Sequence, residues 1–200
     1  MAERLIDLVL MAPFFIFGIV LHEYAHGWVA WKLGDPTAKY SGRLTLDPMA
    51  HFDPFGALMF LFSSLVGVGF GWAKPVPVNF YNLRNPRRDT ILVSLAGPGA
   101  NILLAIACLL CHHLFRSFSP PLSSWFALGF LLNLVLAIFN LLPIPPLDGS
   151  KVLMVLLPPR YAYTYARMEP FGFIILLAFL ATGLFSLIVN AVINLLRFLL

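Results

Sequence analysis

Apolar positions fall into five long runs along this chain, separated by short polar stretches, at residues 5–31, 55–72, 89–115, 124–142 and 171–198. A helix needs roughly 20 apolar residues to cross the hydrocarbon core of a bilayer, and every run is near or above that length. Few residues remain for a separate soluble domain. The pattern therefore predicts an all-α polytopic membrane protein, with the lipid bilayer as its surroundings.

The composition agrees with this prediction, since 60% of the residues are hydrophobic and only 11% are charged, far from the balance of a soluble domain. The first run carries Glu3, Arg4 and Asp7 near its start and lacks a small-residue cleavage site, so we interpret it as a retained span rather than a signal peptide. We expect a single integral membrane domain over 1–200, with its core at 5–155 and an additional C-terminal span at 171–198.

Two cysteines, Cys108 and Cys111, lie in the motif "CLLCHH", which matches the C-x-x-C-H pattern of c-type haem attachment. The pair lies within an apolar run, three residues apart on the predicted helix, where cysteine usually packs as a small hydrophobic side chain. We favour the packing interpretation and keep haem attachment as an alternative.

The most polar feature inside an apolar run is "LHEYAH" at residues 21–26. On a helix, His22 and His26 are four residues apart and share one face, with Glu23 beside them. This is the H-E-x-x-H pattern, in which two imidazoles supply half of a tetrahedral zinc shell and the glutamate is the general base of a hydrolase. Ionisable groups within a membrane are costly unless they are functional, so we predict a metal site here rather than a chance match.

A catalytic zinc site needs a third protein ligand. Asp148 follows "NLLPIPPL" at the end of an apolar run, where prolines break the helix, and precedes a glycine. An aspartate before glycine is often only a turn residue, but in a membrane protein with half a zinc site we favour ligation. The other candidates are His51, His112, His113 and Glu169.

Three motifs, "LHEYAH", "SLAGPGANILLA" and "NLLPIPPLDG", together resemble the site-2 protease family of intramembrane zinc metalloproteases. These enzymes pair H-E-x-x-H on one span with an L-D-G aspartate on a later span. The resemblance covers most of residues 18–155, and "GRLTLDP" and "GWAKPVPVN" are similar to compact bacterial members. No PDZ-like or CBS-like domain accompanies the motifs in this sequence, so the resemblance leaves regulation open.

The resemblance implies one Zn²⁺ held by His22, His26 and Asp148, with Glu23 as the catalytic base. Asn140 matches the asparagine upstream of the family's aspartate, which implies a role in holding the substrate or the oxyanion; a helix-packing amide is the alternative. Asn101 is a further candidate for substrate contact, although with Gly97 and Pro98 it also shapes the start of the third run. The implied substrate is a protein with a transmembrane helix.

The metal ligands constrain the topology without any appeal to a family. His26 lies toward the end of the first run and Asp148 just past the end of the fourth, so both ends must lie on the same side of the membrane. If all five runs crossed fully, they would lie on opposite sides. We predict that 55–72, which is short and rich in glycine and serine, is a re-entrant segment, leaving about four full transmembrane helices.

The basic residues support this topology, because it places ten of them on one side and three on the other. By the positive-inside rule the first group is cytoplasmic, the N-terminus is outside and the metal lies near the cytoplasmic face. We expect this membrane to be a bacterial plasma membrane. The cytoplasmic group is Lys32, Lys39, Arg43, Lys74, Arg84, Arg87, Arg88, Lys151, Arg160 and Arg167; the other is Arg4, Arg116 and Arg197.

A short β-hairpin near the membrane surface is predicted in "AKYSGRLTLDP", where polar and apolar residues alternate from Ser41 to Leu46. Its edge could pair with an unwound substrate by strand addition. Arg43, Leu44 and Thr45 are therefore candidate substrate-binding residues, with a hairpin that merely plugs the site as the alternative.

The sequence indicates an intramembrane zinc metalloprotease, and it leaves a catalytically silent metal-binding scaffold or a transporter as alternatives. No paired internal repeat typical of transporters is visible, and a purely structural metal site needs no base such as Glu23. A net charge of +4 without a basic run among aromatics excludes nucleic acid as a partner. A regulatory membrane partner is expected, and the sequence leaves the oligomeric state open.

Overall fold

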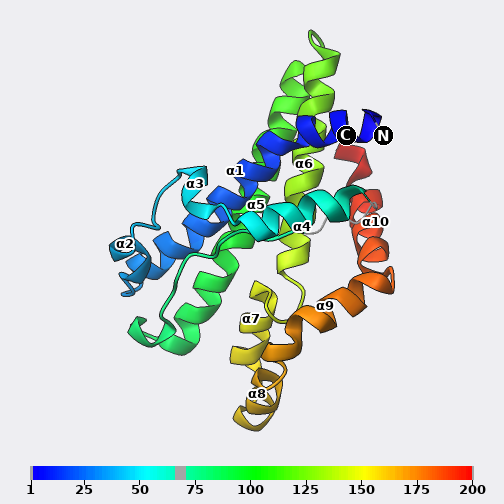
Figure 1. The fold of residues 1–200 in the computed structure, drawn as a ribbon. Coiled ribbons are helices and arrows are strands. Elements are labelled where there is room, and N and C mark those ends of the chain that lie inside the picture. Colours follow the sequence, from blue (N-terminus) through cyan, green and yellow to red (C-terminus); the bar gives the residue numbers. More distant parts are fainter. Residues whose placement is uncertain (1, 66–70, 200) are drawn as a thin grey trace.

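Three long helices form the centre of the fold in the computed structural model, which describes residues 2–65 and 71–199. They are α1 (Ala2–Lys32), α5 (Pro86–Phe115) and α6 (Pro120–Asn140), and they pack against one another (Figure 1). The shorter elements are α2 (Thr37–Tyr40), α3 (Pro48–His51), α4 (Pro54–Leu65), η1 (Phe80–Asn82), α7 (Asp148–Leu156), α8 (Pro159–Ala166), η2 (Glu169–Phe171), α9 (Gly172–Ala181), α10 (Leu184–Leu196) and η3 (Arg197–Leu199).

Four stretches of the described chain are helical, long and apolar enough to cross a membrane: Val9–Lys32, Pro86–Phe115, Pro120–Asn140 and Pro159–Ala181. The described chain thus has four candidate spans, which agrees with the prediction of an integral membrane protein with about four spans. Prolines occupy the first turn of α5 and α6, where the missing N–H costs nothing and the fixed φ suits a helix start.

The centre of the bundle is closed by a small apolar cluster of Phe14, Ala105, Cys108 and Phe130, contributed by α1, α5 and α6. Gly129 makes room for it, since a Cβ there would lie 2.6 Å from the ring of Phe14. Cys108 is 3% exposed within this cluster, and neither it nor Cys111 forms a disulfide. This environment supports the interpretation of Cys108 as a small hydrophobic side chain.

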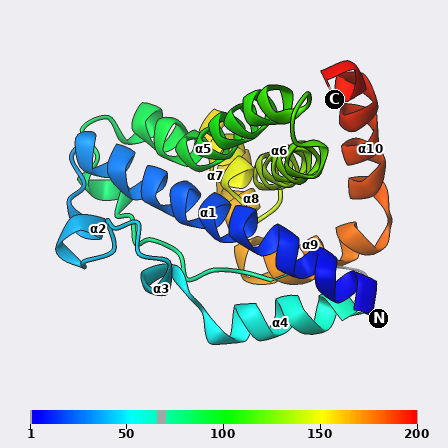
Figure 2. The ribbon, with the colours of Figure 1, turned by 90° about the horizontal axis from the view of Figure 1, so that it is seen from above.

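The long connection from α1 to α5 leaves and returns at the same end of the bundle. The backbone N–H of Arg84, just before α5, donates to the carbonyl of Leu33, just after α1, at 3.1 Å. Within this connection, α4 lies beside α1 and across the direction of α6 (Figures 1 and 2). Its 12 residues extend about 18 Å, less than the roughly 30 Å of a bilayer core.

This geometry agrees with a segment that does not change sides. Part of the predicted re-entrant stretch, residues 66–70, lies outside the described residues, and re-entry into the bilayer stays a prediction.

The predicted β-hairpin is wrong, because no strand forms among residues 2–65 and 71–199. Thr37–Tyr40 form α2, and Gly42, with φ +66°, turns the chain. The neighbouring segment 71–79 contains Pro75 and Pro77, which lack the N–H donors of a strand ladder. The two segments are instead linked by a side chain, because Nη2 of the Arg43 guanidinium donates to the carbonyls of Lys74 and Pro75 at 2.8 and 3.3 Å.

The predicted final span 171–198 is not one helix. Helix α9 ends at Ala181, and Thr182 and Gly183 separate it from α10. Gly183 has a φ of +73°, which a helix cannot contain. Figure 2 shows α10 turning away from α9 at this point. The fourth candidate span instead joins α8, η2 and α9, and Leu184–Leu199 is a shorter apolar helix.

Asp35 joins the ends of the α1–α5 connection and is fully buried. Its carboxylate accepts hydrogen bonds from the backbone N–H and the hydroxyl of Thr37, from the Asn79 N–H at 2.7 Å and from Asn82 Nδ2 at 2.9 Å. Burial raises the pKa of Asp35, but the hydrogen bonds from Thr37, Asn82 and Asn79 lower it by more, so this pKa lies below its ordinary value.

Replacing Asp35 with Asn is expected to destabilise the fold by about 1–3 kcal/mol, because the new NH₂ group would face donors that then lack an acceptor. Since folding lowers the pKa, the wild-type advantage is full above the unfolded value of about 3.9 and is lost as pH falls from there through the folded pKa. Unfolding in detergent, followed at pH 7 and pH 3, measures both effects.

The matched control is Asp47→Asn, since exposed Asp47 caps the Met49 N–H and asparagine is an equal cap. A loss of stability as large in Asp47→Asn would contradict the assignment of a special role to Asp35.

Candidate active site

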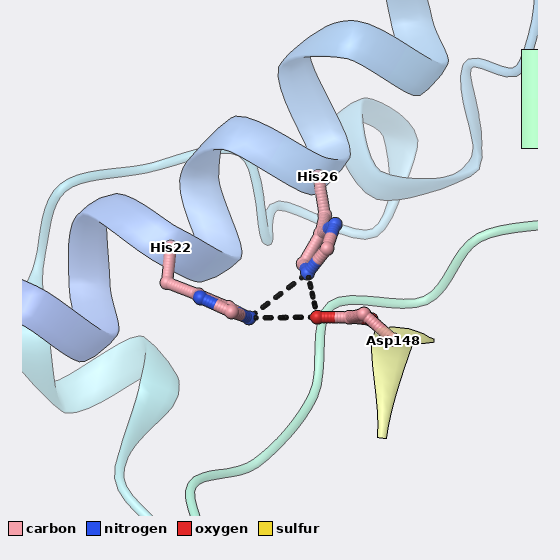
Figure 3. A group of neighbouring side chains, drawn as sticks. All are labelled: His22, His26 and Asp148. Carbon is pink, nitrogen blue, oxygen red and sulfur yellow. Dashed lines mark hydrogen bonds and ion pairs between the residues drawn. The ribbon is translucent and has the colours of Figure 1, made fainter. Parts of the chain in front are cut away.

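Two histidines of one helix and an aspartate distant from them in sequence converge inside the bundle. His22 and His26 project from one face of α1 toward Asp148, the first residue of α7 (Figure 3). The two Nε2 atoms are 3.0 Å apart, and they lie 3.1 and 3.0 Å from Asp148 Oδ2. All three side chains are buried. The structure thus brings together the three residues that the sequence named as ligands.

The other nitrogen of each imidazole, Nδ1, forms a hydrogen bond on the side away from Asp148. His22 Nδ1 lies 2.7 Å from Asn101 Oδ1, and His26 Nδ1 lies 2.7 Å from the carbonyl oxygen of Val93. Amide and carbonyl oxygens only accept hydrogen bonds, so each Nδ1 carries a proton. In their neutral tautomers both imidazoles therefore direct Nε2 lone pairs at Asp148, which is the arrangement of histidine ligands oriented by outer partners.

Three acceptor atoms that face one another at 3.0–3.1 Å need a cation or a shared proton between them. A tetrahedral zinc shell with bonds of about 2.0 Å separates its ligand atoms by about 3.3 Å, so a slight expansion would fit the ion. Among the described residues, this is the group of His, Cys, Asp and Glu side chains whose ligand atoms converge closely enough for a metal. The donor set therefore fits zinc.

Asp148 also contacts a cation of the protein itself, since Lys151 Nζ lies 3.2 Å from its Oδ1. Burial raises the pKa of Asp148, whereas the adjacent His22 and His26 and the nearby Lys151 charge lower it, and the net pKa lies well below its ordinary value. The carboxylate is therefore ionised and can act as a ligand at neutral pH.

Glu23 lies beside the histidines and is held by the backbone of a distant segment. Its Oε2 accepts the N–H of Val76 at 2.7 Å. Segment 71–79, which contains Val76, is fixed by the Lys74 N–H bond to the His51 carbonyl at 3.0 Å and by the contacts of Arg43 described above. The single N–H of Val76, set between two prolines, thus orients the Glu23 carboxylate.

A cavity of about 790 Å³ opens next to these groups. Helices α1, α5, α6, α7 and α9 and segment 71–78 contribute to its wall, which is largely apolar and includes Phe15, Ile19, Phe139, Phe173 and Leu176. Glu23 and the three converging side chains also line this cavity. The cavity can therefore hold an apolar segment of a substrate against polar groups.

The remaining predicted site residues take different positions. Asn140 lines the cavity, and its Nδ2 donates to Leu136 O of its own helix at 2.9 Å. Asn101 is only 1% exposed and hydrogen-bonded to His22. Arg43, Leu44 and Thr45 lie outside the cavity lining, and the strand through which they were predicted to pair with substrate does not form among the described residues.

The alternative third ligands serve elsewhere. His51 Nε2 lies 2.9 Å from the Thr45 carbonyl, and His112 interacts with Ser123 across α5 and α6. Glu169 lines the cavity without joining the metal-ligand group.

Sequence reasoning missed Asn133, Val76 and the steric role of Gly97. A Cβ on Gly97 would lie 2.3 Å from His26 Nε2 and 2.5 Å from His22 Nε2, where the two lone pairs meet. Asn133 was detectable in principle, since it is a lone polar residue in the middle of an apolar run. Val76 was not detectable, because its contribution is a backbone N–H.

Gly97→Ala is expected to lower zinc affinity at least tenfold, because the new methyl group would displace the imidazole nitrogens from their ligand positions. The control is Gly99→Ala on the same helix, where an added Cβ meets nothing within 4 Å. Competition with a chelator dye measures the zinc dissociation constant of both variants. Equal affinities in the two variants would contradict the proposed metal position.

Comparisons with known proteins agree with this site. The profile of Peptidase family M50 matches residues 117–183, and the chain is 42% identical over 187 residues to YwhC of Bacillus subtilis, covering 90% of this chain and 83% of that protein. Rip2 of Mycobacterium tuberculosis is 36% identical over 182 residues, 88% of this chain and 68% of Rip2. Both are named as candidate zinc metalloproteases.

A more distant relative, MJ0392 of Methanocaldococcus jannaschii, is named a zinc metalloprotease and is 26% identical over 145 residues, 72% of this chain and 33% of that protein. No solved structure matches the chain. With its metal-ligand geometry and its similarity to YwhC over most of both chains, this membrane protein belongs to peptidase family M50, the zinc metalloproteases of the site-2 type.

Proposed function

We propose that this chain is an intramembrane zinc metalloprotease that hydrolyses peptide bonds within or near the transmembrane segment of membrane-protein substrates. The observation that carries the proposal is the position of Glu23, which lines the same cavity as His22, His26 and Asp148. A scaffold or a transporter that only bound a metal would not need a carboxylate base there. The whole chain, residues 1–200, acts as a single membrane protease domain in this proposal.

His22, His26 and Asp148 hold the metal through Nε2, Nε2 and Oδ2. Zinc in such a site polarises a carbonyl group and makes a water molecule more acidic. Glu23 takes the proton from the attacking water and passes it to the nitrogen of the scissile peptide bond as that bond breaks. The Val76 N–H already occupies Oε2 of Glu23, so Oε1 is the oxygen available to carry the proton.

Asn140 is a candidate for holding the substrate carbonyl during this reaction. An amide NH₂ group has two hydrogens, and the bond to Leu136 O uses one of them. The second can bind a substrate oxygen at the cavity wall, which supports the role that the motif resemblance implied.

A substrate helix must lose internal hydrogen bonds before its backbone can reach these groups. The apolar side chains that line the cavity favour the side chains of a transmembrane segment, while Glu23 and Asn140 supply polar partners for an extended backbone. Regulation by a membrane partner remains part of the proposal.

Glu23→Gln is expected to abolish cleavage of single-span model substrates by the purified protein, a loss of about 10²–10⁴-fold or more, while zinc content stays near that of wild type. Glutamine keeps the size and an oxygen acceptor for the Val76 N–H but cannot take the proton. Gel analysis of cleavage and metal analysis of the same samples test this expectation. Cleavage by Glu23→Gln at the wild-type rate would exclude Glu23 as the base.

The proposed orientation places the N-terminus outside and the metal near the cytoplasmic face. It rests on the ten-to-three distribution of Lys and Arg between the two sides. The exposed Ser41 and Ser117 lie on opposite sides in this orientation and offer a matched pair for testing it.

In a background where Cys108 and Cys111 are replaced by alanine, Ser117→Cys is expected to react with a membrane-impermeant maleimide in intact cells. Ser41→Cys is expected to react only after the membrane is permeabilised. Labelling of Ser41→Cys and protection of Ser117→Cys in intact cells would reverse the orientation.

A further inference from the structure

Two asparagines lie in the middle of the central helices and are almost completely shielded from solvent. Asn101 of α5 is 1% exposed and Asn133 of α6 is 0% exposed. Both lie within candidate membrane spans, where an amide without a partner is costly. Their hydrogen bonds therefore need an explanation.

The two amides form one chain of hydrogen bonds that begins in α6 and ends on a ring of the active site. Asn133 Nδ2 donates to the Gly129 carbonyl at 3.0 Å, and Asn133 Oδ1 accepts from Asn101 Nδ2 at 3.1 Å. Asn101 Nδ2 also donates to the Gly18 carbonyl at 3.0 Å. Asn101 Oδ1 then accepts from His22 Nδ1 at 2.7 Å.

This chain has only one consistent direction. A carbonyl oxygen accepts and never donates, so the Gly129 and Gly18 carbonyls each require an NH₂ group to face them. That requirement fixes which way both amides point, although an amide alone could be turned over. Asn101 must consequently present its oxygen to His22, and His22 must protonate Nδ1 and leave the Nε2 lone pair free.

Close approach of α1 makes these contacts possible. A Cβ at Gly18 would lie 2.6 Å from Asn133 Oδ1 and 3.3 Å from Asn101 Nδ2. Any larger residue would therefore separate α1 from the two amides. Gly18, one turn before His22, therefore lets α1 pack directly against the two amides.

If the two amides served only to pack the helices together, any polar partner would satisfy them. Packing alone would not require the chain to end on a ligand, nor every member to be oriented by a backbone carbonyl. His26 is oriented by a single backbone carbonyl, that of Val93, whereas His22 depends on two side chains from two other helices. The tautomer and ring direction of His22 thus depend on how α5 and α6 pack.

We infer that Asn101 and Asn133 are positioning residues, a relay that holds His22 in the Nδ1–H tautomer with its Nε2 aimed at the metal. The inference rests on the proposed role of His22 as a ligand. It assigns the relay to metal affinity, so the amide of Asn101 is occupied by His22 rather than by the substrate.

Asn101→Leu is expected to weaken zinc binding about 10–100-fold, the usual effect of removing a partner behind a metal-bound histidine. Asn133→Leu is expected to weaken it less, about threefold to tenfold, because Asn101 keeps its bond to Gly18 O. Asn101→Asp keeps an oxygen for His22 Nδ1 but loses the NH₂ donor, and it is expected to weaken zinc binding less than Asn101→Leu does. Chelator competition measures all three.

Asn190→Leu is the control, since Asn190 is exposed on α10 and the change adds the same apolar side chain. Its zinc affinity is expected to match wild type. A packing role for Asn101 predicts instead that Asp is as damaging as Leu, because both variants lose the NH₂ group. Equal zinc affinity in Asn101→Leu and Asn101→Asp, or wild-type affinity in Asn101→Leu, would overturn the inference.

A second readout needs neither activity nor metal. In protein labelled with ¹⁵N-histidine, the His22 Nδ1–H signal, assigned by its loss in His22→Gln, is expected to exchange with solvent at least tenfold faster in Asn133→Leu than in wild type. Unchanged exchange would overturn the relay even if Asn101→Leu failed to fold. If wild type bound no zinc but the exchange effect were present, the hydrogen-bond relay to His22 would stand, whereas its assignment to metal affinity and the proposed function would fall.

Discussion

Repulsion among buried lone pairs is the constraint around which the fold is organised. His22, His26 and Asp148 bring three acceptor atoms within 3.1 Å of one another in an apolar bundle, where unshielded electrostatic interactions are strong. Such a cluster persists only if a cation or a proton joins it and if outer partners hold each ligand. Gly97 leaves the space beside the two Nε2 atoms free of a side chain. The Val93 carbonyl holds His26, and the Asn101 amide holds His22.

The topology follows from the need to bring those atoms to one depth. The connection from α1 to α5 closes on itself through Arg84 and Leu33 and is braced by Asp35. Helix α5 therefore starts where α1 ends, and α6 returns Asp148 to the same end of the bundle. A full extra crossing between α1 and α5 would separate the ligands by the thickness of the membrane.

Local chemistry was readable from the sequence, and long-range geometry was not. The ligand set was predictable because H-E-x-x-H acts within one helical turn and the proline-rich approach to Asp148 marks a broken helix. The hairpin failed because one arm of it is helical in Thr37–Tyr40, so the alternating residues that follow Gly42 have no partner strand. The final span was misjudged because Gly183 reads as one more small residue in an apolar run until its φ of +73° is known.

Orientation of the proposed base comes from the segment that also forms part of the substrate's cavity. Val76 donates its N–H to Glu23 while its side chain helps line the cavity, and Arg43 fixes the two residues before it. Pro75 and Pro77 leave Val76 as the one residue of that tripeptide able to donate. In the proposed function, a substrate that shifted this segment would also shift the Glu23 carboxylate, so substrate fit would affect the position of the base.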